Sequence, residues 1–229
     1  TAGSSEPNVV AQWLFDEAAL PLVDEVGGIS MSIAFHTPVL STAIPAPFAA
    51  LTPGADFKGA GTYDGVKNAS AQAAIAPNTT SGMVYEFVCT LPYTTALDEC
   101  FFADYDPDAT SRGIQFYKCR GASDLPQVVF KSNDDSLLTI SFSSLSALDD
   151  GLFHKVRLVL NFAGNAQLFV DGVSYGTASL ATLTGKTFNS YQPCIGTNRP
   201  GNDYPLQSVV AEFRISANIT NNSGGPGGG

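Results

Sequence analysis

Residues 151–176, GLFHKVRLVLNFAGNAQLFVDGVSYG, are the part of the sequence that most constrains the fold. Apolar side chains recur there at every second position, a period typical of strands that bury one face. A turn at 163–165 separates two such runs, and the second run ends at Asp171-Gly172, a dipeptide that favours tight turns because glycine tolerates positive φ. The segment therefore predicts a β-hairpin and a second turn. The alternating apolar residues are Val156, Leu158, Leu160, Phe162, Leu168 and Val170.

The same kind of pattern continues through the chain of 229 residues, which is long enough for one large β-sandwich or two small domains. Charged residues make up only 14%, whereas 22 glycines and 14 prolines suit short strands joined by structured loops. No helical period exceeds two turns, so an all-β, two-sheet sandwich is predicted. Residues 16–28 read as an acidic loop and 36–56 as an irregular crossing segment. The expected strands, besides the hairpin, are 9–15, 72–75, 83–91, 100–104, 114–119, 128–131, 138–142, 194–196 and 209–215.

The expected organisation is one domain over residues 9–217, with a polar arm at 1–8 and a glycine-rich tail at 218–229. No stretch resembles a signal peptide, and the chain opens on Thr1, so we expect a processed protein that is extracellular or at a cell or virion surface. No apolar run reaches the roughly 18 residues needed to cross a bilayer, so membrane insertion is not expected.

The formal net charge of -10 argues against nucleic acid as a partner, because phosphate binding needs a basic surface. The acidity serves either solubility or attraction for cations such as calcium. The cysteines form an even set of four, and neither their spacing nor the two histidines favour a zinc site. Cys100 and Cys119 lie on runs that look like hairpin partners. We expect the disulfides Cys100–Cys119 and Cys89–Cys194, with four buried thiols as the alternative.

Five segments occur in a recognisable order: WLFDE at 13–17, FKGAGTYDGV at 57–66, FHKVRLVLNFAGNAQLFVDG at 153–172, CIG at 194–196 and AEFRI at 211–215. Together they resemble the laminin-G-like branch of the concanavalin A-like jelly rolls. Phe153 stands where that pattern usually has Trp, Phe169 where it has Tyr, and Ala211 where the closing strand often has Asp. The resemblance implies an antiparallel jelly-roll sandwich. Such folds host lectins, adhesion modules, enzymes and structural subunits, so function has to come from the site.

Two groups of acidic residues are candidates for a structural calcium ion, which similar domains often hold in loops. Asp104, Asp106 and Asp108 alternate in DYDPDATSRG as oxygen ligands do in a calcium loop, although Ala109 and Gln115 replace its usual Gly and Glu. A solvated acidic turn is the alternative. The second group is Asp16 and Asp24, with Glu17 and Glu25, and would include Glu212 if the first and last strands pair.

Aromatic residues near turn signals are candidates for stacking on sugars, namely Tyr63, Tyr105 and Tyr204, although such a residue is more often a half-buried loop anchor. Four N-x-S/T sequons are possible glycosylation sites, at Asn68, Asn78, Asn218 and Asn221.

Catalytic motifs do not stand out. The paired carboxylates that glycosidases of this fold place on one strand are not found, since Glu86 is alone on its strand. No G-x-S-x-G elbow occurs, and His154 reads as a residue held by a hydrogen bond at a strand start. The predicted function is a non-catalytic extracellular module, a structural or adhesive subunit of a surface or filamentous assembly whose arms contact other copies. A carbohydrate-binding module, with or without calcium, is the alternative, and a glycan-cleaving enzyme is a distant third.

Overall fold

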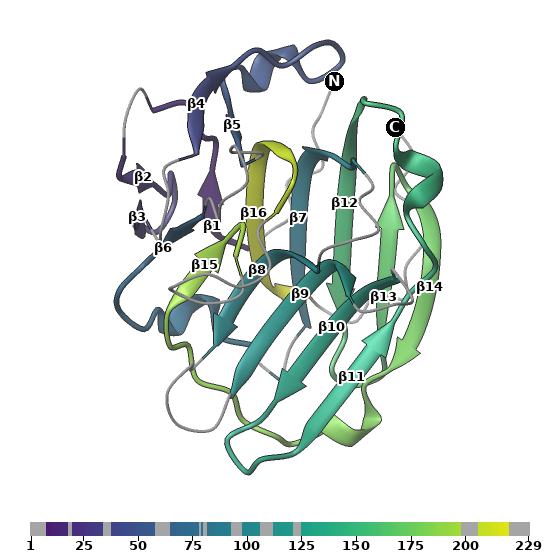
Figure 1. Ribbon diagram of the computed structural model, residues 1–229. Helices are drawn as coiled ribbons and strands as arrows, with labels where there is room; N and C mark the ends of the chain where they lie inside the picture. The colour runs from purple at the N-terminus through teal and green to yellow at the C-terminus, as the bar shows by residue number, and fades with distance from the viewer. Residues whose placement is uncertain are drawn as a thin grey trace.

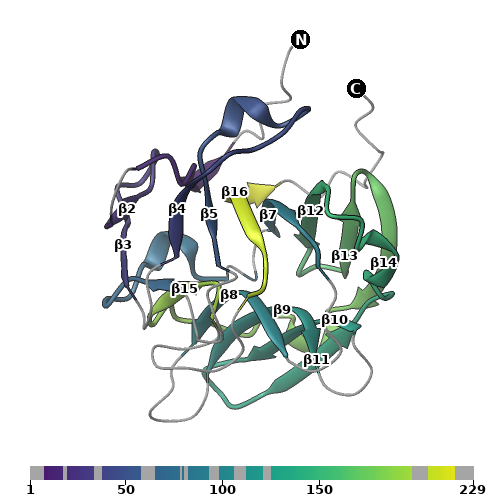
Figure 2. The ribbon, with the colours of Figure 1, turned by 45° about the horizontal axis from the view of Figure 1, so that its top comes forward.

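The structure, a computed structural model, describes residues 8–17, 20–33, 38–57, 65–77, 79, 82–92, 98–105, 112–120, 125–197 and 206–219. Over these residues it consists of two antiparallel sheets that face each other (Figures 1 and 2). The predicted two-sheet jelly-roll sandwich is confirmed. No helix in the described part of the chain has the length and apolar character that crossing a membrane requires.

The first sheet contains the predicted hairpin, and both ends of the domain also contribute strands to it. Its strands in spatial order are β14 (Val173–Ser179), β13 (Asn165–Val170), β12 (Phe153–Leu160), β7 (Gly82–Thr90), β16 (Val209–Ile219), β5 (Gly54–Asp56) and β4 (Val39–Thr42), and β1 (Val9–Trp13) also pairs with β16. The first and last strands therefore pair, which is the condition under which the second acidic group was expected to include Glu212.

The second sheet lies opposite and is built mainly from the middle of the chain. Its strands in spatial order are β11 (Leu137–Ser141), β10 (Leu125–Lys131), β9 (Gly113–Arg120), β8 (Glu99–Tyr105), β15 (Pro193–Ile195), β6 (Val66–Lys67), β3 (Ser30–Ile33) and β2 (Leu22–Val23). In the described part of the chain, short 3-10 helices occupy connections between strands: η1 (Ala49–Leu51), η2 (Ala73–Ile75), η4 (Ser146–Leu148) and η5 (Ala181–Leu183).

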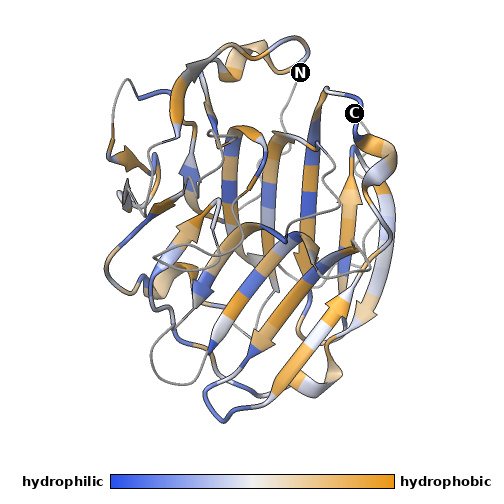
Figure 3. Ribbon diagram, in the orientation of Figure 1, coloured by the Kyte–Doolittle hydropathy of each residue, from blue (hydrophilic) through white to orange (hydrophobic). Residues whose placement is uncertain are grey.

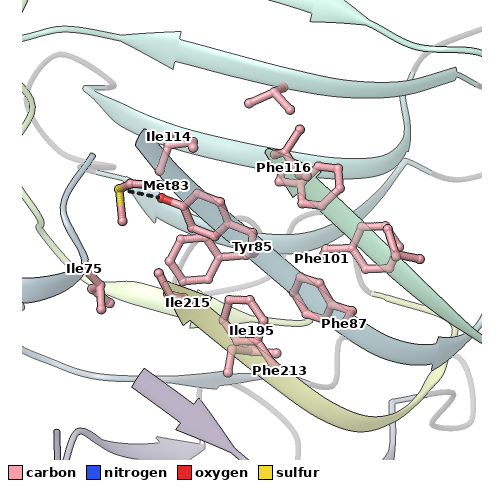
Figure 4. Close-up of a cluster of buried hydrophobic side chains, with 14 of the residues drawn as sticks. Ile75, Met83, Tyr85, Phe87, Phe101, Ile114, Phe116, Ile195, Phe213 and Ile215 are labelled. Atoms are coloured by element: carbon pink, nitrogen blue, oxygen red, sulfur yellow. Dashed lines mark hydrogen bonds between the residues drawn. The ribbon is translucent and has the colours of Figure 1, made fainter. Parts of the chain in front are cut away.

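The core between the sheets is rich in aromatic rings from both of them (Figure 4). Phe87 of β7 stacks on Phe213 of β16 with ring centroids 4.1 Å apart, and it also stacks on Phe101 of the second sheet at 4.9 Å. Trp13 extends the stack from β1, 5.5 Å from Phe213. Along the strands, hydrophobic and hydrophilic residues alternate (Figure 3). The predicted period of two thus places one face of each sheet in the core.

Some sequence predictions need correction. Residues 72–75 were expected as a strand but contain η2, whose Ile75 is buried in the core. Residues 36–56 are not simply irregular, because they hold β4 and β5, which pair with each other. Strand β14 follows the Asp171-Gly172 turn and was not predicted, because its side chains are mostly exposed and give no clear apolar alternation.

The predicted disulfides Cys100–Cys119 and Cys89–Cys194 are also wrong, since all four cysteines are buried thiols. Cys119 lies opposite Glu99 in the register of β8 and β9, whereas Cys100 lies opposite Tyr117 and packs with it. Cys89 belongs to the main core on β7 of the first sheet, and Cys194 lies on β15 of the second sheet. Cys89 and Cys194 thus lie on different sheets, and Cys100 and Cys119 are not directly opposite each other.

The predicted domain border at residue 217 falls inside a strand. β16 continues through Ile219, and the backbone N–H of Ala217 donates to the carbonyl of Asn8 at 3.0 Å. Both residues therefore pair within the chain's own first sheet.

Candidate functional site

The outer face of the first sheet carries a row of side chains that are directly opposite one another across five strands. Core-facing residues of β12 alternate with Lys155 and Arg157, which point away from the core. Arg157 is opposite Glu86 of β7, and Glu86 is opposite Arg214 of β16. The row continues to Phe169 on β13 and to Gln12 on β1. We call these five residues, Phe169, Arg157, Glu86, Arg214 and Gln12, the cross-strand row.

Glu86 is the centre of this row and the common partner of three cations. Its side chain is only 4% exposed, with Lys155 Nζ 3.0 Å from Oε1 and Arg157 Nε 3.6 Å from Oε2. Arg214 Nη2 donates a further hydrogen bond to Oε1. The side chains of Lys155, Arg157 and Arg214 are 44%, 33% and 20% exposed. In this cluster, solvent meets the cations while the carboxylate lies beneath them.

The residues beside the cluster supply hydrogen-bonding groups and an aromatic ring. Gln12 Nε2 donates to Glu212 Oε1 at 2.6 Å, and Gln167 Nε2 on β13 donates to Thr177 Oγ1 on β14 at 3.4 Å. Phe169, directly opposite Arg157, is partly exposed. Amide, guanidinium and carboxylate groups next to a ring are the kind of surface that binds sugars, and here they stand on paired strands rather than on loops.

His154 lies at the start of β12, on the opposite, core-facing side of the sheet. Its Nδ1 is 2.7 Å from Asp171 Oδ2, and its Nε2 is 3.1 Å from Asp150 Oδ1. Burial lowers the pKa of His154, but the two carboxylates outweigh it, so the pKa is raised overall. Cys89 is opposite His154 on β7, and burial raises the pKa of its thiol to about 12. A thiol of this kind is not an activated nucleophile, and the contacts of His154 fit the predicted positional role.

Of the predicted calcium loop, Asp104 is described, whereas Asp106 and Asp108 lie outside the described residues. Asp104 is fully buried at the end of β8, and the backbone N–H of Tyr191 donates to its Oδ1 at 2.6 Å. Burial raises the pKa of Asp104 to about 6, against hydrogen bonds from Ser190 and the backbone at 191–192 that lower it. A calcium site in this loop stays a prediction.

The second predicted metal group does not assemble. Asp24 is buried, and both of its oxygens accept backbone N–H groups, from Gln12 and Val26 at Oδ1 and from Gly27 and Ile29 at Oδ2. Asp24 therefore organises the turn before β3. Asp16 is exposed, and Glu212 accepts the hydrogen bond from Gln12. Among the described residues, no three His, Cys, Asp or Glu side chains gather as metal ligands would.

The predicted surface sites lie mostly outside the described residues: this holds for Tyr63, Tyr204, Asn78 and Asn221, while Tyr105 ends β8 and Asn218 lies within β16. Asn68 is described. Its Nδ2 donates to the Ser30 carbonyl at 2.8 Å and its Oδ1 accepts the Ser70 N–H at 2.7 Å. Glycosylation at any of the four sequons stays a prediction.

Sequence reasoning missed the cross-strand row. Each member occupies an outward position of an alternating strand, a signal that the sequence does contain. What joins the members is the pairing of β7 with both β12 and β16, although residues 91–152 separate β7 from β12 in the chain and residues 91–208 separate it from β16. Alternation alone does not specify which strands become neighbours.

Solved structures with this fold include binding domains of toxins. The binding domain of botulinum neurotoxin DC, in complex with rat synaptotagmin II, matches with a TM-score of 0.63 and 14% identity over 93% of this chain and 49% of that chain. A structure of botulinum neurotoxin type C, whose cell entry depends upon interaction with two ganglioside molecules, matches with a TM-score of 0.64 and 15% identity. The match covers 96% of this chain and 50% of that chain. The ligand-binding domain of botulinum neurotoxin serotype D, in complex with N-acetylneuraminic acid, matches with a TM-score of 0.59 and 11% identity. The match covers 95% of this chain and 49% of that chain.

This chain spans about half the length of those structures, and at such low identity the likeness concerns the fold. No curated protein sequence matches the chain. The family match is independent of these structures and extends over residues 60–221, which include β6 and β16 and the whole predicted hairpin. With more than half of its length matched and the two-sheet jelly roll in place, the chain belongs to the concanavalin A-like lectin/glucanases superfamily.

Proposed function

We propose that this domain is a carbohydrate-binding module that holds a glycan on the outer face of the first sheet. The observation that carries the proposal is the cross-strand row, in which Phe169 offers a ring and Arg157, Arg214 and Gln12 offer polar groups along one line of paired strands. A pyranose binds by laying an apolar face on a ring while its hydroxyls meet donors and acceptors.

Rigid placement of these groups favours binding. Side chains on paired strands that are already held by hydrogen bonds, as Gln12 is by Glu212, lose less conformational freedom when a ligand arrives. The names of similar proteins support the class of ligand: the superfamily is described as lectins and glucanases, and two structures of the same fold are linked to gangliosides and to N-acetylneuraminic acid. The position of the glycan on this chain rests on the row alone.

The test is a broad glycan array followed by calorimetric titration of any glycan retained. Phe169→Ala and Gln12→Ala should each weaken binding about tenfold, the effect of losing one good contact. Lys131→Ala, on β10 of the second sheet, is the matched control and should bind as the parent does. Thermal unfolding of each variant separates lost binding from lost folding. Binding to no glycan on the array would contradict the proposal.

The predicted role as a structural or adhesive subunit, extracellular and in contact with other copies, stays a prediction. Its expected donor segments are residues 1–8 and 217–229. Asn8 and Ala217 pair inside the chain's own sheet, so strand donation would have to use 1–7 or 220–229. Native mass measurement at high concentration tests it, and a strict monomer would count against it.

A further inference from the structure

The cluster around Glu86 has an unequal distribution of charge between the sheet and the solvent. One carboxylate, 4% exposed, is covered by an ammonium and two guanidinium groups whose side chains are between 20% and 44% exposed. Taken alone, the three cations and one anion leave an excess of two positive charges, and the positive groups are the accessible ones. An approaching ligand therefore meets a cationic surface at the middle of the cross-strand row.

That surface contrasts with the rest of the chain. The sequence has 11 Lys and Arg against 21 Asp and Glu, and three of the 11 converge on Glu86. An acidic protein repels anionic ligands at most places on its surface, so a local cationic cluster gives an anion one preferred position. A neutral sugar would gain little from this arrangement.

The geometry of the cations suits a carboxylate. The ammonium and the two guanidinium groups already converge on one carboxylate, that of Glu86. The planar fork of a guanidinium also matches the two oxygens of a carboxylate. An ammonium has three donors, and Lys155 directs one of them to Glu86, 3.0 Å away. Lys155 is also the most exposed of the three, so it can serve a second carboxylate from the solvent side.

The surroundings further restrict where such a group would lie. Glu212 and Lys155 lie on opposite sides of Val88 in the strand register, so Glu212 places a negative charge on the β16 side of the cluster. Phe169 lies on the other side, directly opposite Arg157. A ligand with its carboxylate over Arg157 and Lys155 and its ring over Phe169 keeps that carboxylate away from Glu212 and uses the one aromatic member of the row, while further sugar units can extend along the row toward Gln12.

We infer that the glycan is acidic, a sugar whose carboxylate binds Arg157 and Lys155 while its ring lies on Phe169. Sialic and uronic acids share this chemistry. The inference rests on the proposed carbohydrate-binding function and adds the class of sugar.

The test compares sialyllactose and a glucuronate-terminated disaccharide with lactose, the neutral counterpart of the first, by calorimetric titration. At low salt, both acidic sugars should bind at least about tenfold more tightly than lactose. Only one of them should do so if the structure of the sugar ring also affects binding. The preference should shrink at high salt, because the cations are partly exposed and are screened. Equal binding of lactose and the acidic sugars would overturn the inference and leave the proposed function standing. No binding of any sugar would overturn both.

Variants then locate the preference. Arg157→Gln and Lys155→Gln should each reduce the ratio of acidic to neutral affinity about fivefold to tenfold, and Arg157→Lys should retain part of it because it keeps the charge but loses the fork. Lys131→Gln removes a cation from the second sheet and should leave the ratio as in the parent. An unchanged ratio in Arg157→Gln and Lys155→Gln would overturn the inference, as would inorganic sulfate or phosphate that competes as well as the acidic sugars do.

Discussion

His154 Nδ1 lies 2.7 Å from Asp171 Oδ2, and this contact joins the start of β12 to the turn after β13. The other ring nitrogen reaches Asp150 in the preceding loop at 3.1 Å. Asp171 also accepts the backbone N–H of Lys155 at 2.9 Å. A protonated imidazole satisfies both carboxylates at once, whereas a neutral ring has only one N–H to donate. The connection between the loop and the turn is therefore strongest when His154 is charged.

The first prediction is a pH-dependent stability that resides in this connection. Because the folded-state pKa of His154 is raised above 6.5, its stabilising contribution is complete below about pH 6 and is lost as pH rises through the folded-state pKa. His154→Asn should lower the free energy of unfolding by about 1–2 kcal/mol at acidic pH and by less at alkaline pH. The expected loss is modest because solvent screens the half-exposed carboxylates of Asp150 and Asp171. Urea unfolding of both proteins across pH measures it, and parallel pH profiles would contradict it.

A second prediction concerns Glu86 and the three cations around it. Glu86→Gln keeps the shape of the side chain but leaves Lys155, Arg157 and Arg214 without the carboxylate between them. We expect a loss of about 1–3 kcal/mol in the free energy of unfolding, less than for a fully buried pair because the cations are partly exposed. Added salt should reduce the loss by screening repulsion among the cations.

Asp135→Asn is the matched control, since Asp135 is exposed and also pairs with two cations, Arg112 and Lys131. It should change the midpoint of urea unfolding little. If Glu86→Gln shifts the midpoint of urea unfolding as little as Asp135→Asn does, the buried position of Glu86 adds nothing to stability. If an acidic sugar binds as inferred, Glu86→Gln should retain its binding, because the cations remain.

The sequence predicted the scaffold better than the surface, for a physical reason. A period of two in residues 153–170 is set by burial against the core, so it identified β12 and β13 with little need for tertiary information. The position of Glu86 between Arg157 and Arg214 depends on which strands pair, and each residue alone reads as an ordinary outward polar group. The expected disulfide Cys100–Cys119 also depended on the strand register, which places Cys119 opposite Glu99, and both cysteines are free thiols.

A third prediction concerns Asp104, whose burial raises its pKa to about 6. A carboxyl with a raised folded-state pKa contributes its full stability below the ordinary value of 3.8 and loses it as pH rises through about 6, so at pH about 8 the ionised group is a cost. Asp104→Asn keeps an oxygen for the Tyr191 N–H. It should increase the free energy of unfolding at that pH by up to about 3 kcal/mol and change it little near pH 4. A variant less stable at alkaline pH would contradict this.

A fourth prediction follows from the buried thiols. Cys89, Cys100, Cys119 and Cys194 should react slowly with a thiol reagent in the native protein and react fully in denaturant without a reductant. Burial raises the thiol pKa of both Cys89 and Cys194 to about 12, so little thiolate is available while the protein is folded. Mass measurement after alkylation counts the modified cysteines. Two or four unmodified cysteines in denaturant would instead indicate disulfides.

The last prediction concerns the pair formed by Lys118 of β9 and Glu99 of β8, which is almost completely buried. Lys118 Nζ is 2.5 Å from Glu99 Oε2 and also donates to the Pro92 carbonyl at 2.5 Å, while the backbone N–H of Gln207 donates to the same Glu99 oxygen at 2.8 Å. Lys118→Met leaves a buried carboxylate without its cation, so we expect a loss of about 3–5 kcal/mol. Adding Glu99→Leu removes that charge and should recover part of the loss. About 1–2 kcal/mol should remain, because the Pro92 carbonyl and the Gln207 N–H have lost their partners. The free energies of unfolding of the two single variants and the double variant form a cycle, in which additive losses would show that the two charges are not coupled.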